Sequence, residues 1–235
     1  MTPDFTTHAF THRQAQAEAL AEHIAARLRD ALEQRGTATL AVSGGSTPKD
    51  CFARLAREAL DWSRVRITLV DERWVPDSDE RSNARLVKTT LLQHAAAAAS
   101  FVPLYTGDAT PEAGLATAEA RIEALPRPFD VVMLGMGEDG HTASFFPGGD
   151  HLAEALDPHG QRHVLPMRAA GAGEPRITLT LPTLLDTRSL YLLITGETKR
   201  DLLADARQGQ GAARDYPIRA VLTQQRVPVS VYWSP

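Results

Sequence analysis

Short apolar segments alternate with amphipathic helical segments along the whole of this chain. Apolar residues that recur at three- and four-residue spacings predict helices between the apolar segments. Strands that are apolar along their whole length are buried on both faces, which is typical of a parallel sheet covered by helices. We therefore expect one α/β domain over residues 1–235, a doubly wound, mostly parallel sheet with helices on both faces. The expected strands are residues 37–42, 65–70, 129–134, 189–195 and 227–233, and the expected helices are residues 12–35, 49–60, 82–94, 111–125 and 198–206.

The charge and composition of the chain argue against several classes of protein. Its 235 residues carry 25 basic and 29 acidic side chains, a net charge of −4. A nucleic-acid-binding protein needs a basic surface, so we expect no nucleic-acid partner. The first residues lack the regions of a signal peptide, and no apolar run approaches the roughly 20 residues that span a bilayer. Since the single Cys51 cannot form an intramolecular disulfide, we expect a cytoplasmic protein without a membrane partner.

Lysine is rare in this chain. Of the 25 basic residues only Lys49, Lys88 and Lys199 are lysines, and the rest are arginines. Because an ammonium group and a guanidinium group differ in chemistry, a lysine retained against this bias indicates a position where a lysine is needed.

Three unusual polar segments each follow a predicted strand, at residues 43–48, 71–74 and 135–141. The carboxyl ends of parallel strands meet at one edge of the sheet, and doubly wound folds bind their ligands beyond that edge. We therefore expect all three segments, as loops, to surround one active site. A fourth glycine-containing segment, residues 169–175, is expected to be a surface loop.

The first segment, Ser43-Gly44-Gly45-Ser46-Thr47-Pro48, has two interpretations. Its glycines allow backbone N–H groups to approach a ligand, and its hydroxyl groups and the following helix N-terminus favour a phosphate. The alternative is an ordinary strand-to-helix turn with Ser or Thr as the N-cap. The segment is neither a P-loop nor a hydrolase elbow, because Ala41 stands where the elbow requires glycine.

The second segment, Asp71-Glu72-Arg73-Trp74, is either a surface turn or a charged group that faces the expected crevice. Its position directly after an apolar strand favours the crevice. There the planar fork of Arg73 could hold a phosphate or a carboxylate.

The third segment formally matches the G-x-G-x-x-G dinucleotide pattern over residues 135–140. However, Glu138 and Asp139 place two negative charges where a pyrophosphate would lie. The break at residues 147–149 also comes too soon for the helix that a dinucleotide-binding unit needs. We therefore expect no dinucleotide cofactor.

His141 is the leading candidate for a catalytic group, although a single histidine is more often a packed or surface residue. Asp139 precedes it by two positions, and a nearby carboxylate can orient an imidazole that acts as a general base. His151 and Glu154 form a possible metal pair, but no second cluster completes a site. We therefore expect no metal.

Taken together, three motifs resemble the 6-phosphogluconolactonase family. The resemblance rests on residues 43–48, on residues 71–74 with Ser82-Asn83, and on residues 135–148, and it continues over residues 176–182 and 195–199. It implies hydrolysis of 6-phospho-D-glucono-1,5-lactone to 6-phospho-D-gluconate in the oxidative pentose phosphate pathway, with no cofactor and no metal.

The same resemblance implies a role for individual residues. His141 would activate water as the general base, and Asp139 would orient its ring. Arg73 and Lys199 would be the main cationic partners of the substrate, and Arg176 a weaker one. The implied substrate-binding residues are Ser43, Gly44, Gly45, Ser46, Thr47, Asp71, Arg73, Asn83, Gly137, Arg176 and Lys199.

Two other functions are compatible with parts of this pattern. Glucosamine-6-phosphate deaminases have similar motifs, but Phe146 stands where they typically carry a glutamate, and Arg73 replaces an aromatic residue that is common there. A sugar-phosphate sensor of a transcriptional regulator would need a DNA-binding region, for which the segment before the first expected strand is too short. The partner is thus expected to be a small sugar-phosphate lactone, and the oligomeric state stays open between a monomer and a weak dimer.

Overall fold

The computed structural model describes residues 5–209 and 211–235, and its centre is a sheet of seven strands. Every neighbouring pair in this sheet is parallel. The predicted α/β class with a mostly parallel sheet is therefore confirmed. In spatial order the strands are β1 (Phe5–Ala9), β10 (Val229–Ser234), β9 (Leu190–Thr195), β6 (Val131–Leu134), β2 (Ala38–Val42), β3 (Val65–Leu69) and β5 (Ser100–Val102).

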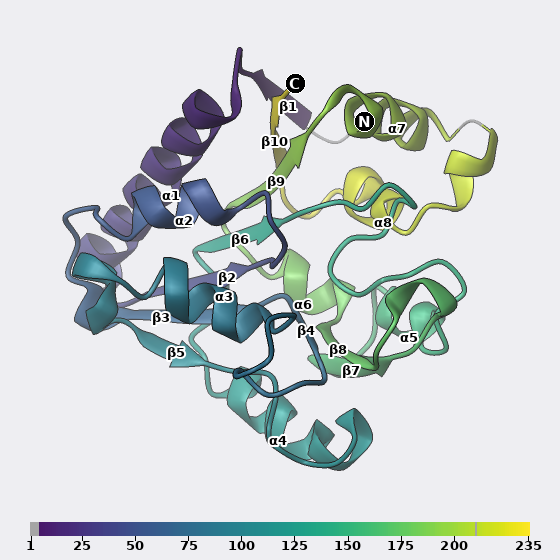
Figure 1. The fold of residues 1–235 in the computed structure, drawn as a ribbon, viewed down its shortest axis with the longest axis horizontal. Coiled ribbons are helices and arrows are strands. Elements are labelled where there is room, and N and C mark those ends of the chain that lie inside the picture. Colours follow the sequence, from purple (N-terminus) through teal and green to yellow (C-terminus); the bar gives the residue numbers. More distant parts are fainter. Residues whose placement is uncertain (1–4, 210) are drawn as a thin grey trace.

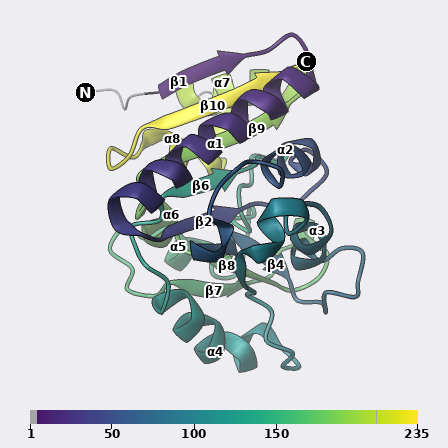
Figure 2. The same ribbon diagram turned by 90° about the vertical axis from the view of Figure 1, so that its left-hand side faces the viewer.

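Helices cover both faces of this sheet (Figure 1 and Figure 2). Crossovers between parallel strands are right-handed, so the direction of each crossover decides which face its helix covers. The crossovers that advance from β1 toward β5 carry α1 (Arg13–Arg35), α2 (Lys49–Leu55) and α3 (Asn83–Thr90) on one face. Those that return toward β10 carry α4 (Pro111–Glu123), α6 (Leu181–Leu185), α7 (Glu197–Gln208) and α8 (Ile218–Thr223) on the other.

The direction of the crossovers reverses between β2 and β6, which lie side by side. In doubly wound folds such a reversal opens a crevice at the carboxyl ends of the two strands. Here the segments 43–48 and 135–141 leave the sheet at that point. The backbone N–H of Gly135 donates to the hydroxyl oxygen of Ser43 at 3.1 Å, and the N–H of Ser43 donates to the carbonyl of Met133 at 3.0 Å. These two hydrogen bonds fix the segments against each other.

The expectation that residues 71–74 form a loop is wrong. Asp71–Arg73 is a strand, β4, which follows β3 after Val70 alone. It belongs to a second, antiparallel sheet of three strands, with β8 (Arg176–Leu179) in the centre and β7 (Val164–Met167) at the edge. Because β4 obtains its partner from more than 100 residues further along the chain, local sequence could not reveal it.

The connection between β7 and β8 is the segment 169–175, which was expected to be a surface loop. Residues 170, 171 and 173 are exposed, Ala172 is buried and the others are half-buried, and a short 3₁₀ turn occupies Ala170–Ala172. A single helical turn, α5 (Leu152–Ala155), lies against β7.

Several predicted helices end earlier than expected. The helix predicted over residues 49–60 ends at Leu55, the one predicted over residues 82–94 ends at Thr90, and the one predicted over residues 111–125 ends at Glu123. Short 3₁₀ turns lie further along the chain at Trp62–Arg64 and His94–Ala98. The sequence analysis missed the short strands β1, β5, β7 and β8 and the short helices α5, α6 and α8. None of the helices in the described part of the chain is long and apolar enough to cross a membrane.

The long helix α1 is fixed to the sheet by one buried polar side chain. The amide of Gln16 donates to the carbonyls of Ile194 and Tyr232 at 2.7 and 2.8 Å, and its oxygen accepts from the Ser234 hydroxyl at 3.0 Å. These three hydrogen bonds join the buried Gln16 side chain to the ends of β9 and β10.

Replacing Gln16 with leucine should lower the free energy of unfolding by about 2–4 kcal/mol, because two carbonyls and a hydroxyl lose their partner. Gln14→Leu is the matched control, since Gln14 is exposed on the same helix and should change stability by about 0.5 kcal/mol or less. Denaturant unfolding of both variants measures the difference. Equal effects would contradict a clamping role for Gln16.

Candidate active site

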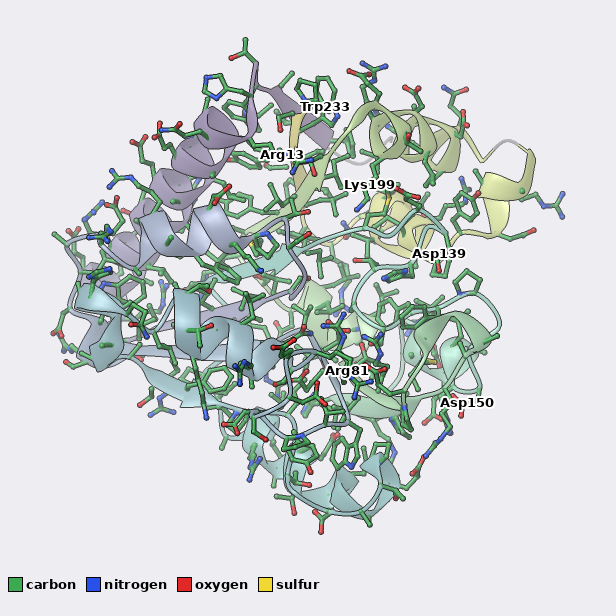
Figure 3. The ribbon with its side chains drawn as sticks, viewed as in Figure 1. Arg13, Arg81, Asp139, Asp150, Lys199 and Trp233 are labelled. Atoms are coloured by element: carbon green, nitrogen blue, oxygen red, sulfur yellow. The ribbon has the colours of Figure 1, made fainter. Side chains whose placement is uncertain are left out.

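A cleft of about 310 Å³ lies at the carboxyl ends of β2 and β6. Its walls come from the segments after β2 and β6, from β4 and β8 of the small sheet, and from the first turn of α7. Figure 3 labels three side chains from this part of the molecule, with Arg81 below Asp139 and Lys199 in that view. Of the residues named from the sequence, the cleft is lined by His141, Ser43, Gly44, Gly45, Ser46, Thr47, Asp71, Arg73, Asn83, Gly137, Arg176 and Lys199. Asp139 lies behind His141, outside this lining.

The segment 43–48 is not a turn with a Ser or Thr N-cap. The residue at the N-cap of α2 is Pro48, and no side chain of the described residues caps this helix. Gly44 is required because a Cβ there would lie 1.8 Å from Oδ1 of Asn83. The backbone of this segment therefore packs directly on the Asn83 side chain, while the exposed Ser46 faces the cleft.

Three neighbours fix the imidazole of His141. Its Nδ1 lies 2.5 Å from Oδ1 of Asp139, and the same carboxylate oxygen accepts from the His141 backbone N–H at 3.1 Å. The ring of Phe146 stacks against it at a centroid distance of 4.3 Å. A Cβ on Gly137 would lie 2.3 Å from Nδ1, so only glycine allows this ring position. With Nδ1 bonded to Asp139, Nε2 has no partner within the described residues and stays available to a ligand.

The loop that carries His141 is supported from behind by the segment before α8. The backbone N–H of Ile218 donates to the carbonyl of Gly140 at 3.0 Å. The ring of Tyr216 packs directly on Gly140. The sequence analysis missed both residues, because no local motif marks them as neighbours of a loop some 75 positions earlier.

Two guanidinium groups are held side by side on the small sheet. Arg73 of β4 and Arg176 of β8 are directly opposite partners in the antiparallel pair. Like charges in such a pair repel, and the positive charge of Arg73 contributes to lowering the pKa of Arg176, after burial as the larger cause. Arg176 is buried, donates to the Ala172 carbonyl and lies 3.9 Å from Asp71.

Lys199 contributes a third positive charge from the first turn of α7. Within residues 5–209 and 211–235 its ammonium group has neither an ion pair nor a hydrogen bond. The lining holds three cationic side chains, Arg73, Arg176 and Lys199, and one carboxylate, Asp71, so the cleft has a surplus of positive charge. This arrangement suits an anionic ligand.

Glu72 does not face the crevice, contrary to the favoured interpretation of the charged segment. It is 0% exposed, and Oε1 accepts from the backbone N–H groups of Arg73 and Asn83, both at 2.8 Å. Oε2 accepts from the N–H of Ala84 at 2.7 Å and from the Ser82 hydroxyl at 3.1 Å. The carboxylate therefore joins β4 to the first turn of α3 and fixes two residues of the cleft.

Burial raises the pKa of Glu72 from 4.5 to about 7, although three backbone N–H donors act in the opposite direction. The sequence analysis did not identify this buried role, because an Asp-Glu pair after a strand has the same pattern whether it faces a ligand or a helix end.

A metal site in a protein needs several acidic, histidine or cysteine side chains around one point. Among the described residues, no group of three or more His, Cys, Asp or Glu side chains is arranged to hold a metal ion. His151 and Glu154 lie 3.5 Å apart as an exposed pair.

Comparison with known proteins assigns the chain to a family. Residues 11–233 match the family described as glucosamine-6-phosphate isomerases/6-phosphogluconolactonase. The chain belongs to this family. Among its members, the 6-phosphogluconolactonase of Rhizobium meliloti is 54% identical, over 97% of this chain and 98% of the relative. That of Mesorhizobium japonicum is 51% identical, over 98% and 96%.

A solved structure of the same family has nearly the same fold. The 6-phosphogluconolactonase from Shewanella baltica is 42% identical, and the two chains cover each other completely with a TM-score of 0.93. The predicted family resemblance is therefore confirmed, as is the expected fold class.

The raised pKa of Glu72 predicts a specific dependence of stability on pH. The folded chain binds this proton more tightly than the unfolded chain does, so the contribution is fully present below pH 4.5 and is lost as the pH rises through about 7. Between pH 5 and pH 8 the wild-type protein should lose about 2–3 kcal/mol more stability than Glu72→Gln, which cannot ionise.

Denaturant unfolding at both pH values measures this difference. Glu80→Gln is the control, because Glu80 is exposed and the variant should keep the wild-type slope. Parallel slopes for the wild-type protein and Glu72→Gln would show that Glu72 does not titrate in this range.

Proposed function

We propose that the protein hydrolyses 6-phospho-D-glucono-1,5-lactone to 6-phospho-D-gluconate, a step of the oxidative pentose phosphate pathway. The observation that carries this proposal is the single cleft in which an oriented imidazole faces the same space as three cationic side chains. The names of the curated relatives support the same activity. A sugar lactone with a distant phosphate needs a base at one end and positive charge at the other.

His141 acts as the general base. Nδ1–H donates to Asp139, so Nε2 carries the lone pair that takes a proton from a water molecule. The water oxygen attacks the lactone carbonyl carbon and forms a tetrahedral intermediate. The bond from that carbon to the ring oxygen then breaks, and the imidazolium returns the proton to the departing oxygen. The reaction consumes one water, needs no covalent nucleophile and, in this proposal, uses no metal and no organic cofactor.

The anionic groups of the substrate are held by the rest of the cleft. Lys199 and Arg73 bind the phosphate, with Arg176 behind them, and the backbone and hydroxyl groups of residues 43–47 bind the phosphate or adjacent hydroxyls of the sugar. Asp71, Asn83 and Gly137 complete the walls. Backbone N–H groups of the glycine segments, or a cation, stabilise the oxyanion of the intermediate, a contribution typically worth about 2.7–4 kcal/mol.

The same fold family includes deaminases, and one contact favours the lactonase. Phe146 stacks on His141 at the position where the deaminase motif carries a glutamate. An aromatic ring cannot exchange protons with the imidazole, so His141 is paired with Asp139 alone. Release of ammonia from glucosamine 6-phosphate would decide for the deaminase.

Removing the base should remove most of the catalysis. His141→Ala should lower kcat for the phosphorylated lactone by about 10²- to 10⁴-fold, measured above the spontaneous rate of hydrolysis. Asp139→Asn should lower kcat in the same direction, because the amide no longer stabilises the charged imidazole. His151→Ala, which changes an exposed histidine, is the control and should keep wild-type kcat. A His141→Ala variant with unchanged kcat would remove this residue from its role.

Lys199 should discriminate between a phosphorylated and an unphosphorylated substrate. Lys199→Gln should lower kcat/KM for the phosphorylated lactone by about 10- to 100-fold, as expected when a charged hydrogen bond is lost. Hydrolysis of glucono-1,5-lactone should change little. Lys88→Gln is the control, because Lys88 pairs with Asp77 on the exposed side of α3. An equal loss on both lactones would make the role of Lys199 structural.

A further inference from the structure

A second hollow, of about 290 Å³, lies beside the catalytic cleft. We call it the α2–α3 groove, because its walls come from the first residues of α2, from residues 80–82 and from α3. It shares Gly45, Ser46, Arg73 and Asn83 with the cleft, so the two spaces adjoin each other. The residues that line the groove alone are Lys49, Glu80, Arg81, Ser82, Arg85, Leu86, Thr89 and Thr90.

The α2–α3 groove is lined by four cationic side chains, those of Lys49, Arg73, Arg81 and Arg85, and by one carboxylate, Glu80. Lys49 is exposed, and within the described residues its ammonium group forms no hydrogen bond and no ion pair. Arg85 donates to the carbonyl of Ser78 and forms no ion pair in the described part of the chain, although Asp77 and Asp79 are near enough to interact with its charge. Arg81 is neutralised by ion pairs with Asp79 and Glu174.

Arg73 connects the groove to the cleft. Its Nη1 donates to the Arg81 carbonyl at 2.8 Å and to Oδ1 of Asn83 at 2.7 Å, which holds the guanidinium at the boundary of the two spaces. Its Nε is buried and has no partner. An anion in the groove and an anion in the cleft would therefore both meet the same side chain.

The overall charge of the protein makes a local cationic groove useful. A chain with a net charge of −4 repels a phosphorylated lactone at long range. Clefts lined by one sign of charge concentrate ligands of the opposite sign and can raise association rates by about 10- to 1,000-fold. Lys49 and Arg85 line the groove and not the cleft that holds His141, so they can attract the substrate without taking part in the chemical step.

We propose that the α2–α3 groove is a docking site for the phosphate group of the incoming lactone, formed by Lys49, Arg85 and Arg73. The phosphate monoester binds there first and then passes along Arg73 into the cleft. This inference rests on the proposed function, which supplies the phosphorylated substrate. The docking role gives a reason for the lysine at position 49 in a chain that has only three lysines.

The test compares Lys49→Gln and Lys49→Glu with Arg57→Gln. Arg57 is exposed just after α2 and lies outside both spaces. Arg57→Gln removes one positive charge from the protein, as Lys49→Gln does. At low ionic strength, kcat/KM for the phosphorylated lactone should fall about 3- to 10-fold in Lys49→Gln and further in Lys49→Glu, with kcat within about twofold. The loss should shrink at about 0.5 M salt, where charges are screened within a few ångströms.

Three results would overturn the docking site. They are equal effects of Lys49→Gln and Arg57→Gln, a loss of the same size for glucono-1,5-lactone, and a loss confined to kcat. Each would assign the effect of Lys49 to net charge or to structure instead.

A second measurement separates this proposal from the proposed function. Inorganic phosphate is titrated into the wild-type protein and into the double variant Lys49→Gln/Arg85→Gln by calorimetry at low ionic strength. The double variant should bind at least threefold more weakly or at a lower stoichiometry. Identical titrations would reject the groove, whether or not the wild-type protein hydrolyses the lactone. A wild-type protein without lactonase activity would reject the proposed function alone.

Discussion

The right-handedness of strand crossovers is the constraint on which the rest of this structure depends. It forces the helices after β2 and the elements after β6 onto opposite faces of the sheet. The two strands remain hydrogen-bonded neighbours, so the backbone opens only beyond their carboxyl ends. Both glycine-rich segments leave the sheet there, and Ser43 ties one to the other through Gly135. The place of the cleft is thus a consequence of the path of the chain, and the side chains only decide what the cleft can bind.

The cationic side of the cleft has a separate origin, in the small antiparallel sheet. A buried carboxylate, Glu72, joins that sheet to the start of α3 through three hydrogen bonds and accepts a fourth from the N–H of Arg73 in its own strand. Arg73 and Asn83 are the residues adjacent to those bonds, so their side chains enter the cleft from a fixed backbone. The imidazole on the opposite wall is fixed in a comparable way, by Asp139, Phe146 and the absence of a side chain at Gly137.

Sequence reasoning reached the elements whose signals are local. Apolar runs such as residues 65–70 and the glycine-rich segments after two strands are visible without knowledge of distant partners, and they were enough to bring His141 and Ser43 into one hypothesis. Lys199 joined that hypothesis through the family resemblance and the rarity of lysine. The small sheet was out of reach, because β4 is three residues long and pairs with a strand a hundred positions later. Glu72 was assigned to the wrong side for the same reason, and Tyr216 carries no pattern that connects it to Gly140.

In the proposed site, the opposed pair Arg73 and Arg176 would couple the folding of the protein to the binding of an anion. The folded chain places Arg73 and Arg176 opposite each other on neighbouring strands, where their like charges interact, whereas the unfolded chain lets them separate. An anion that binds between them therefore stabilises the folded chain. The free energy of unfolding rises by about 2.7 kcal/mol when the anion concentration is a hundred times its dissociation constant. The supply of sugar phosphate in the cell would then govern how long the protein lasts against heat and proteolysis, in addition to how fast it works.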